Sequence, residues 1–438
     1  MNASISRMNA NLFRFQGTAG NSQSDGLNSS RLARWSMYAL VAYPLVDYAL
    51  RLPHIHLLGI IWDKVVLLIL AAIALKHWVE GSRPGLFTWQ RFAGWYMLFG
   101  FALMLAGLAH PLVAIDGYRT DIYYMLYTFL IPFVVAPKDV LKLLHAAAAI
   151  AILIGIHGVY QYITKAPIPA AWISPGEHFR TRVYSVLMSP NELGAYMALM
   201  TPLVFGLFMY EQHRVRKWMY GFGSLVCLAT LLFTFTRGAW VALGLAVIIV
   251  AVLFERRLLI PLAVVIVIAF FVPSIHIRFM HLLSPVYYLK SATEGGRLAR
   301  WMQAFDHLAP NPLFGAGLGR YGGLVAVDFH LGIYSDNFYA KTLGESGIIG
   351  LVLFLSLHIA LIREVIRKVV RPMTGRAKFV VLGGVTGLLA VVFHNFVENV
   401  FEFAPMSVMY FNLATLYLIW GRKTPANETE PTPKTQMT

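Results

Sequence analysis

Two arginines lie in a short segment whose spacing could hold a phosphate or diphosphate group. Arg180 and Arg182 come just before Ser189-Pro190, a pair that predicts the start of a helix, because Ser is a good N-cap and Pro suits the first helical position. Guanidinium groups are always charged and bind phosphate oxygens in pairs. The segment could therefore bind an anionic substrate. An interfacial pair that anchors lipid headgroups fits the spacing as well.

Two further segments place arginines among apolar residues. The stretch Thr-Phe-Thr-Arg-Gly-Ala-Trp at 234 to 240 sets Arg237 between two apolar runs. A guanidinium there either extends to lipid headgroups or holds an anion, and the spacing leaves both readings open. Arg297 and Arg300 precede a glycine-rich run. That run lacks the Lys-Ser or Lys-Thr pair of a phosphate loop, so we interpret it as a flexible turn.

Proton-accepting side chains lie near two other apolar runs. Asp336-Asn337 precedes the run that begins near 343, and His394 lies close to the end of another, together with Glu398 and Glu402. A carboxylate or an imidazole can take a proton from a hydroxyl group. For the histidine and the two glutamates, hydrogen bonding to neighbours at a helix end is the simpler explanation.

The composition places the elements that carry these residues in a membrane. Of the 438 residues, 58% are hydrophobic and 13% are charged, with a mean hydropathy of +0.62. Soluble chains are about 45–50% apolar and about 25% charged. A membrane-spanning helix satisfies its own backbone hydrogen bonds, so we expect an all-α, polytopic membrane protein. The net charge of +15 lies in clusters between apolar runs, which favours membrane topology over a nucleic-acid partner. A single cysteine, Cys227, leaves no pair for a disulfide or a thiolate metal site.

The apolar runs predict about 12 transmembrane helices, since each needs about 20 apolar residues. Tails at 1–34 and 422–438 are expected to be disordered. Between them we expect spans one to nine in 35–274, a long outer loop in 275–342, and spans ten to twelve in 343–421. The expected helices are 35–51, 57–75, 93–113, 121–136, 141–163, 190–210, 218–235, 238–254, 258–274, 343–362, 379–397 and 404–421.

The distribution of Lys and Arg predicts which side each loop faces. In this scheme 23 of the 36 basic residues lie on the side of the N-terminus, including every dense cluster. The positive-inside rule makes that side, and therefore both termini, cytoplasmic in a cell membrane. The arginine segments then lie on the outer side. The long 275–342 stretch carries Trp301, Phe305, Leu313 and Phe314 at helix-like spacing, which predicts short amphipathic helices on the membrane face.

Taken together, the segments resemble the O-antigen ligase and polymerase family of integral membrane glycosyltransferases. The resemblance covers roughly residues 180 to 350 and rests on four motifs in the family's order. They are Arg-x-x-Ser…Pro-Asn at 182–191, Thr-x-Thr-Arg-Gly at 234–238, Gly-Arg-x-x-x-Trp…Pro-x-x-Gly-x-Gly at 296–317, and Asp-Asn…Gly-Glu-x-Gly at 336–347.

The resemblance implies transfer of a glycan carried on undecaprenyl diphosphate, at the outer face of the cytoplasmic membrane, to a glycan or glycolipid acceptor. It implies that Arg182 and Arg297 hold the leaving diphosphate, which arginines can do without a metal or cofactor. Arg237 is expected to support them. We place Arg180, Arg300 and Asn337 in the substrate-binding group as well.

One position departs from the family pattern. A histidine, expected before Asn337 as the base for the acceptor hydroxyl, is replaced by Asp336. A carboxylate is a weaker base unless its pKa is raised. The departure leaves His394 as an alternative base and slightly favours a repeat-unit polymerase over a ligase.

Two other functions compete with glycan transfer. The first is a transporter of a small anion such as bicarbonate, which should concentrate polar residues and broken helices at the membrane midplane. The second is a membrane scaffold without chemistry. Here the unusual charges lie in loops, and a scaffold leaves the arginines unexplained.

Overall fold

The computed structural model describes residues 30–51, 56–169, 181–282, 285–293 and 295–422. In these ranges all the regular secondary structure is helical. No strand is present, and the one isolated β-bridge joins Gly322 to Tyr334. Both expected tails fall largely outside the described residues, and so does Arg180.

The first half of the chain forms a group of helices that begins at Arg31. Their bounds are α2 Arg31–Val41, α3 Tyr43–Leu50, α4 His56–Val79, α5 Thr88–Ala106, α6 Pro111–Asp121, a 3₁₀ turn Tyr123–Leu126, α7 Tyr127–Val134, α8 Pro137–Thr164, α9 Pro190–Tyr210 and α10 Arg214–Phe233.

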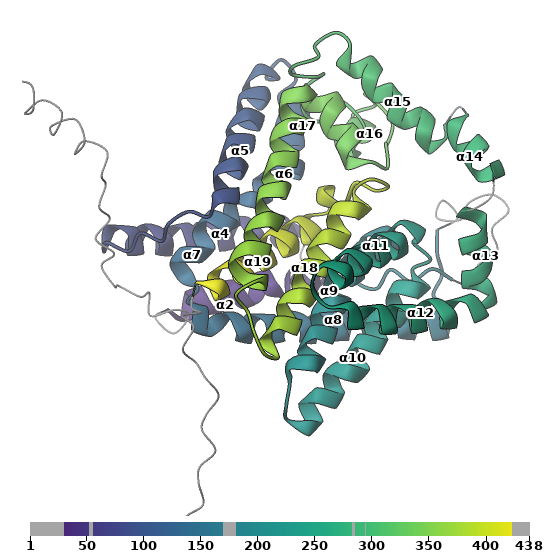
Figure 1. Ribbon diagram of the computed structural model, residues 1–438. Coiled ribbons are helices and arrows are strands. Elements are labelled where there is room, and N and C mark those ends of the chain that lie inside the picture. The colour runs from purple at the N-terminus through teal and green to yellow at the C-terminus, as the bar shows by residue number, and fades with distance from the viewer. Residues whose placement is uncertain (1–29, 52–55, 170–180, 283–284, 294, 423–438) are drawn as a thin grey trace, which may run out of the picture.

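The second half adds long helices separated by a set of short ones. Their bounds are α11 Arg237–Phe254, α12 Leu259–Phe271, α13 Pro273–Leu282, α14 Pro285–Ala292, α15 Arg297–Leu308, α16 Leu324–Asp328, α17 Phe338–Val365, α18 Ala377–His394 and α19 Ala404–Gly421. Figure 1 shows α15 and α16 at one end of the molecule and the lower end of α10 at the other.

Six described helices are long and apolar enough to cross a membrane, which makes the chain a multi-pass membrane protein. They correspond to α4, α8, α9, α11, α18 and the helix that runs from Phe338 through α17 to Val370. The scheme of 12 spans stays a prediction. One boundary in it agrees with the structure: the division between 218–235 and 238–254 is the gap between α10 and α11.

Proline explains most differences between the expected and observed helices. The expected helix 35–51 is divided into α2 and α3, where Pro44 lies in the first turn of α3. The expected helix 93–113 ends at Ala106, and α6 begins at Pro111. The helix expected at 258–274 ends at Phe271, and α13 begins at Pro273. Proline has no N–H group and disfavours helical backbone in the preceding residue, so it begins a new helix.

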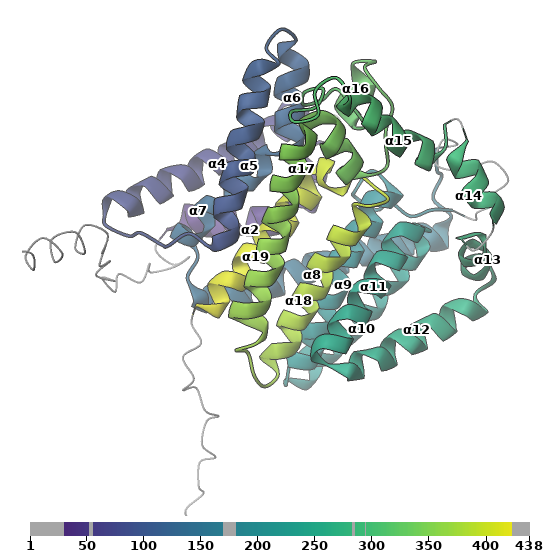
Figure 2. The same cartoon turned by 45° about the horizontal axis from the view of Figure 1, so that its top comes forward.

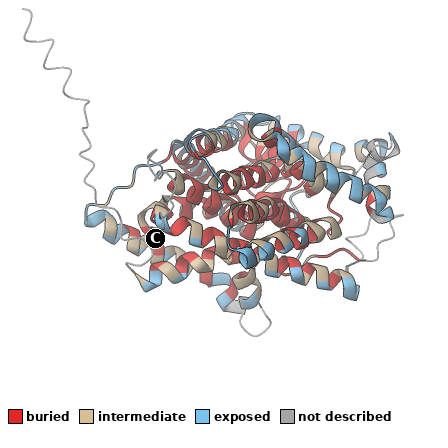
Figure 3. Ribbon diagram, turned by 60° about the horizontal axis from the view of Figure 1, so that its bottom comes forward, coloured by how far each residue is buried: buried red, intermediate tan, exposed pale blue. Residues whose placement is uncertain are grey.

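Glycines bring the central helices into close contact. A Cβ atom at Gly383 or Gly387 of α18 would overlap the backbone carbonyl of Pro202 or Leu199 in α9. A Cβ at Gly206 of α9 would likewise lie against Phe379 of α18. Small residues at helix contacts are typical of membrane proteins, where close backbone packing replaces the hydrophobic effect. The α9–α18 pair, most of whose residues are buried, therefore forms a dense centre, and Figure 3 shows buried residues gathered in the middle of the molecule.

Peripheral helices leave large apolar side chains exposed. No residue of α12 is buried, and this helix runs along the rim of the molecule in Figure 2. On α15, Leu298, Met302 and Phe305 are exposed while Ala304 is buried. Exposed apolar faces of this kind suit contact with lipid. Of the residues in the expected amphipathic pattern, Trp301 and Phe305 lie in α15, whereas Leu313 and Phe314 lie in turns outside any helix.

Candidate active site

Asp336 joins two arginines of α15. The Asp336 carboxylate accepts hydrogen bonds from Arg297 Nε at 3.2 Å and Arg300 Nη2 at 2.6 Å. The two arginines are three residues apart, so they share one face of the helix. Asp336 itself has left-handed backbone with φ of +53°, a conformation that Asp tolerates better than most residues.

Three further hydrogen bonds fix α15 against the loop before α17. Arg300 Nη1 donates to the carbonyl of Tyr334 at 2.5 Å, and Trp301 Nε1 donates to the carbonyl of Ser335 at 2.9 Å. Tyr321 donates its hydroxyl to the carbonyl of Arg300 at 2.5 Å. The side chain of Arg297 remains about a third exposed. A ligand can therefore reach it.

Arg182 is held in a buried position by the segments that precede α9 and α11. Its Nε donates to the carbonyl of Thr234 at 3.0 Å, and Nη2 donates to Asn191 Oδ1 at 3.1 Å and Thr236 Oγ1 at 3.4 Å. The local fold follows the predicted helix start, because Ser189 Oγ caps α9 by accepting from the N–H of Asn191. This prediction is confirmed.

A chain of partly buried hydrogen bonds connects Arg182 to the loop of Asp336. Asn191 accepts from Arg182 and donates its amide N–H to Glu398. The other carboxylate oxygen of Glu398 accepts from the Tyr334 hydroxyl at 3.1 Å. Tyr334 is two residues before Asp336. The predicted residues Arg182, Arg297, Arg300 and Asp336 thus belong to one connected group, which we call the arginine site.

Glu398 has the most perturbed environment in the arginine site. Burial and the charge of Asp336 together raise the pKa of Glu398 to about 7, while Arg297 opposes the shift. Burial, with the nearby charge of Glu398, also raises the pKa of Tyr334 well above its usual value. The sequence indicated only a polar residue at a helix end here, because nothing local shows that Asn191 and Tyr334 converge on it.

Three predicted residues have other surroundings. Asn337 is the N-cap of α17, and its side-chain oxygen accepts from the N–H groups of Tyr339 and Ala340 at 3.0 Å. Arg237 is the first residue of α11 and is partly exposed. His394 ends α18 and is buried, with its Nδ1 unpaired among the described residues.

The Arg237 segment packs directly on His394. A Cβ at Gly238 would lie 3.1 Å from His394 Nε2, so glycine allows the ring to sit against the start of α11. An additional arginine, Arg278 of α13, donates its Nε to the carbonyl of Phe235 at 2.7 Å. Arg278 therefore lies against the short segment between α10 and α11 that precedes Arg237.

A second charged group lies beside the arginine site. The buried ammonium of Lys341 contacts Asp121, Glu345 at 2.8 Å and Glu402 at 3.5 Å. Glu402 also accepts from the N–H of Leu324 at 3.1 Å. Burial raises the pKa of Glu402 to about 7, although Lys341 opposes the shift. This group ties the α16 loop to α17 and to the segment before α19.

The arrangement can bind a large anion. Arg182, Arg297 and Arg300 present three permanent positive charges, while Asp336 and Glu398 are the carboxylates that face them. A diphosphate could compete with Asp336 for the arginines, because phosphate and carboxylate oxygens use the same donors.

Comparison with known families gives one finding. Residues 222–355 match the family model described as O-antigen ligase. The matched range contains Arg237, Arg297, Arg300 and Asp336. It covers three of the four motifs that carried the resemblance and leaves out the one at 182–191. Comparison with curated proteins gives no match.

Proposed function

We propose that this chain, whose residues 222–355 match the O-antigen ligase family model, joins glycan units carried on undecaprenyl diphosphate. The reaction takes place at the outer face of the cytoplasmic membrane and contributes to surface polysaccharide. The family match supports surface-polysaccharide biosynthesis and gives no support to the anion-transporter alternative.

One observation carries the proposal. A continuous set of contacts joins Arg182, Asn191, Glu398 and Tyr334 to the Asp336–Arg297–Arg300 cluster. It draws together residues from α9, the 395–403 segment, the loop before α17, and α15. Converging arginines fixed by other polar groups are what a leaving diphosphate needs, since fixed donors stabilise developing charge without reorganisation.

The donor in this mechanism is a glycan linked through its C1 carbon to the diphosphate. Arg182 and Arg297 bind the diphosphate, and Arg300, Arg237 and Arg180 add positive charge around it. An acceptor hydroxyl oxygen attacks C1, and the bond between C1 and the phosphate oxygen breaks. The bonding electron pair stays on the diphosphate, where the arginines stabilise it.

The acceptor hydroxyl must lose its proton as the new glycosidic bond forms. We assign Asp336 as the base, with His394 as the alternative. Diphosphate binding at Arg297 and Arg300 would release the Asp336 carboxylate to accept that proton. Asn337 orients the loop as cap of α17.

The function is tested with purified protein in lipid nanodiscs and an undecaprenyl-diphosphate oligosaccharide. Formation of longer lipid-linked chains would support a polymerase, which we favour slightly. Transfer only to a glycolipid would support a ligase. Absence of glycan transfer with matched host substrates would overturn the proposal.

Deletion of the gene in its host gives an independent readout. A polymerase mutant should display surface glycans of one repeat unit on a gel. A ligase mutant should accumulate long chains that remain attached to the carrier lipid.

A further inference from the structure

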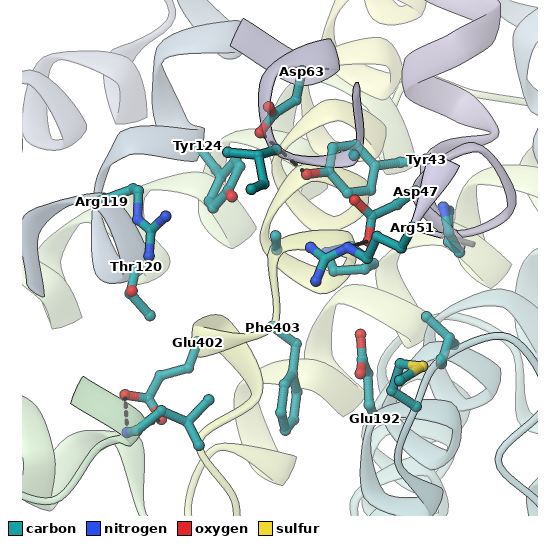
Figure 4. Close-up of a pocket in the computed structure, with 18 of the residues that line it drawn as sticks. Tyr43, Asp47, Arg51, Asp63, Arg119, Thr120, Tyr124, Glu192, Glu402 and Phe403 are labelled. Carbon is teal, nitrogen blue, oxygen red and sulfur yellow. Dashed lines mark hydrogen bonds and ion pairs between the residues drawn. The ribbon is translucent and has the colours of Figure 1, made fainter. Parts of the chain in front are cut away.

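A cavity of about 400 Å³ lies next to the arginine site. Its lining comes from α3, α4, α6, the start of α9, α16 and the segment before α19. The volume is within the range of about 300–1,000 Å³ that is usual for small-molecule sites. Figure 4 shows Glu192, Glu402 and Phe403 on one side of it and Tyr43, Arg51 and Asp63 on another.

Carboxylates outnumber cations in this cavity. Three of its acids are paired with its three cations: Asp47 with Arg51 at 2.8 Å, Asp63 with Lys64 at 2.9 Å, and Asp116 with Arg119 at 3.1 Å. Three more acids line the space, namely Glu192, Asp328 and Glu402. The cavity is therefore acidic, in contrast to the arginine site.

Glu192 is a buried acid of this cavity that lacks a partner among the described residues. Its residue is 7% exposed, and its carboxylate makes no hydrogen bond or ion pair among the described residues. Buried carboxylates are normally hydrogen-bonded or paired, because an unpaired one is costly. In Figure 4 the Glu192 carboxylate points into the cavity. A ligand that donates hydrogen bonds would satisfy it.

Residues that are close together in the sequence belong alternately to the arginine site and to the cavity. Asn191 takes part in the arginine site, and the next residue, Glu192, lines the cavity. Glu398 takes part in the arginine site, and Glu402, four residues further on at the end of the 3₁₀ helix Val400–Glu402, lines the cavity. Asn399 connects the two glutamates through its backbone N–H to Glu398 at 3.1 Å and its side-chain amide to Glu402 at 3.1 Å.

From this placement we propose that the cavity binds the terminal sugar of the acceptor glycan, and that this sugar is neutral or carries an amine rather than an acidic group. The inference rests on the proposed function and adds the substrate class. Sugar hydroxyls or an ammonium donate hydrogen bonds to Glu192 and Asp328. Tyr43, Tyr124 and Phe403 supply ring surface for the apolar face of a sugar. A uronic acid would find no free cation among the described residues of the cavity, because Arg51, Lys64 and Arg119 are each paired with an aspartate.

The test uses three matched probes with the full-length protein in detergent at pH 7. The probes are methyl glucoside, methyl glucosaminide and methyl glucuronide, and their binding is measured by saturation-transfer NMR without donor lipid. We expect the first two to bind and the glucuronide to bind at least about tenfold more weakly, because a hydrogen bond to a charged group is worth roughly that factor or more.

Glu192→Gln should weaken binding of the glucoside and the glucosaminide about tenfold and improve binding of the glucuronide. Asp328→Asn should reduce the difference in binding between the glucuronide and the other two probes. Because Asp328 is exposed on α16, this variant tests the inference even if Glu192→Gln does not fold. Asp306→Asn is the matched control, because Asp306 is an exposed acid on α15 that does not line the cavity. It should keep wild-type selectivity.

Equal binding of the three probes, or unchanged selectivity in both Glu192→Gln and Asp328→Asn, would overturn the inference. A transfer assay separates this result from the proposed function. Normal transfer with an unchanged acceptor KM in both variants rejects the acceptor cavity and keeps the enzyme. Absence of transfer in the wild type rejects the proposed reaction, while the probe selectivity still reports whether the cavity binds sugars.

Discussion

Arg182 and Arg297 differ in how tightly the protein holds them. Arg182 is buried and donates to groups of three residues, whereas the Arg297 side chain is about a third exposed. Both are proposed to bind the diphosphate. Removing the first also leaves buried acceptors unpaired, which costs stability, while removing the second should leave the fold almost unchanged.

We therefore expect Arg297→Ala to reduce the transfer rate by about 10²–10³ with little change in thermal stability. Arg182→Ala should lose a similar rate and also unfold at a lower temperature. Arg297→Lys should remain defective, because an ammonium is a single point charge. Transfer assays and thermal unfolding of the purified variants provide the measurement. Full activity in either alanine variant would remove that residue from the mechanism.

Asp336→Asn separates a catalytic base from a structural partner. Asparagine tolerates the left-handed backbone at this position and keeps a hydrogen-bond acceptor for the arginines. If Asp336 is the base, the variant should lose about 10²–10⁴ in rate, and Asp336→His should retain part of it. Near-normal transfer by Asp336→Asn would reject the base role and make His394 the next residue to test.

The ionisation of Glu398 predicts a dependence of rate on pH. The deprotonated carboxylate accepts from both Asn191 and Tyr334, so transfer should rise as the pH passes upward through about 7. Glu398→Gln should remove that inflection and lower the plateau rate. An inflection near 7 that persists in the Gln variant would assign it to another group.

The same shift has the opposite effect on stability. The folded-state pKa of Glu398 is raised above its ordinary value, so the folded protein favours the protonated form. This contribution to stability is fully present below the ordinary pKa of the group. It is lost as the pH rises toward about 7. The ionised form that the mechanism uses is therefore the less stable one.

At the residue scale, the sequence indicated the arginines and Asp336 because their charge is unusual beside apolar runs. It could not indicate Glu398 or Glu192 as special. Both roles depend on the position of Asn191 in the fold. Asn191 binds Glu398 of the arginine site, more than two hundred positions away in the chain, and the residue that follows it, Glu192, lines the cavity.

At the scale of elements, the α9–α18 contact should be the least tolerant of added volume. Gly383→Ala would push a methyl group into the carbonyl of Pro202, and overpacking of this kind typically costs about 1–3 kcal/mol. Gly244→Ala in α11 is the matched control, since no atom lies within 4 Å of a Cβ there. We expect thermal unfolding in detergent at a clearly lower temperature for the first variant only. Equal unfolding temperatures would argue against the tight packing.

The positions of most long helices follow from apolar runs, and the sequence predicted many of them within a few residues. It failed where a run continues across a proline or a change of direction. Residues 121–136 looked like one span, yet they contain the end of α6, a 3₁₀ turn and the eight-residue α7, with Pro132 inside it. Hydropathy measures burial in apolar surroundings and does not report where the backbone turns.

At the scale of the whole molecule, the arginine site is predicted to face away from the cytoplasm. The native Cys227 is buried, so it gives a low labelling background. Cysteine placed at Ser291, in α14, should react in intact cells with an impermeant thiol reagent, whereas cysteine placed at Ser24 should react only after permeabilisation. Equal labelling of both positions in intact cells would overturn the topology.

The double contact of Asp336 with Arg297 and Arg300 has a consequence for the order of events. While both arginines hold the carboxylate, it is neutralised and cannot readily take a proton. A water molecule that enters an empty site therefore finds no active base. Arrival of the lipid-linked donor exchanges its diphosphate for the carboxylate, and only then does the site become reactive. We expect compulsory-order kinetics, in which the donor must bind before the acceptor hydroxyl can be deprotonated.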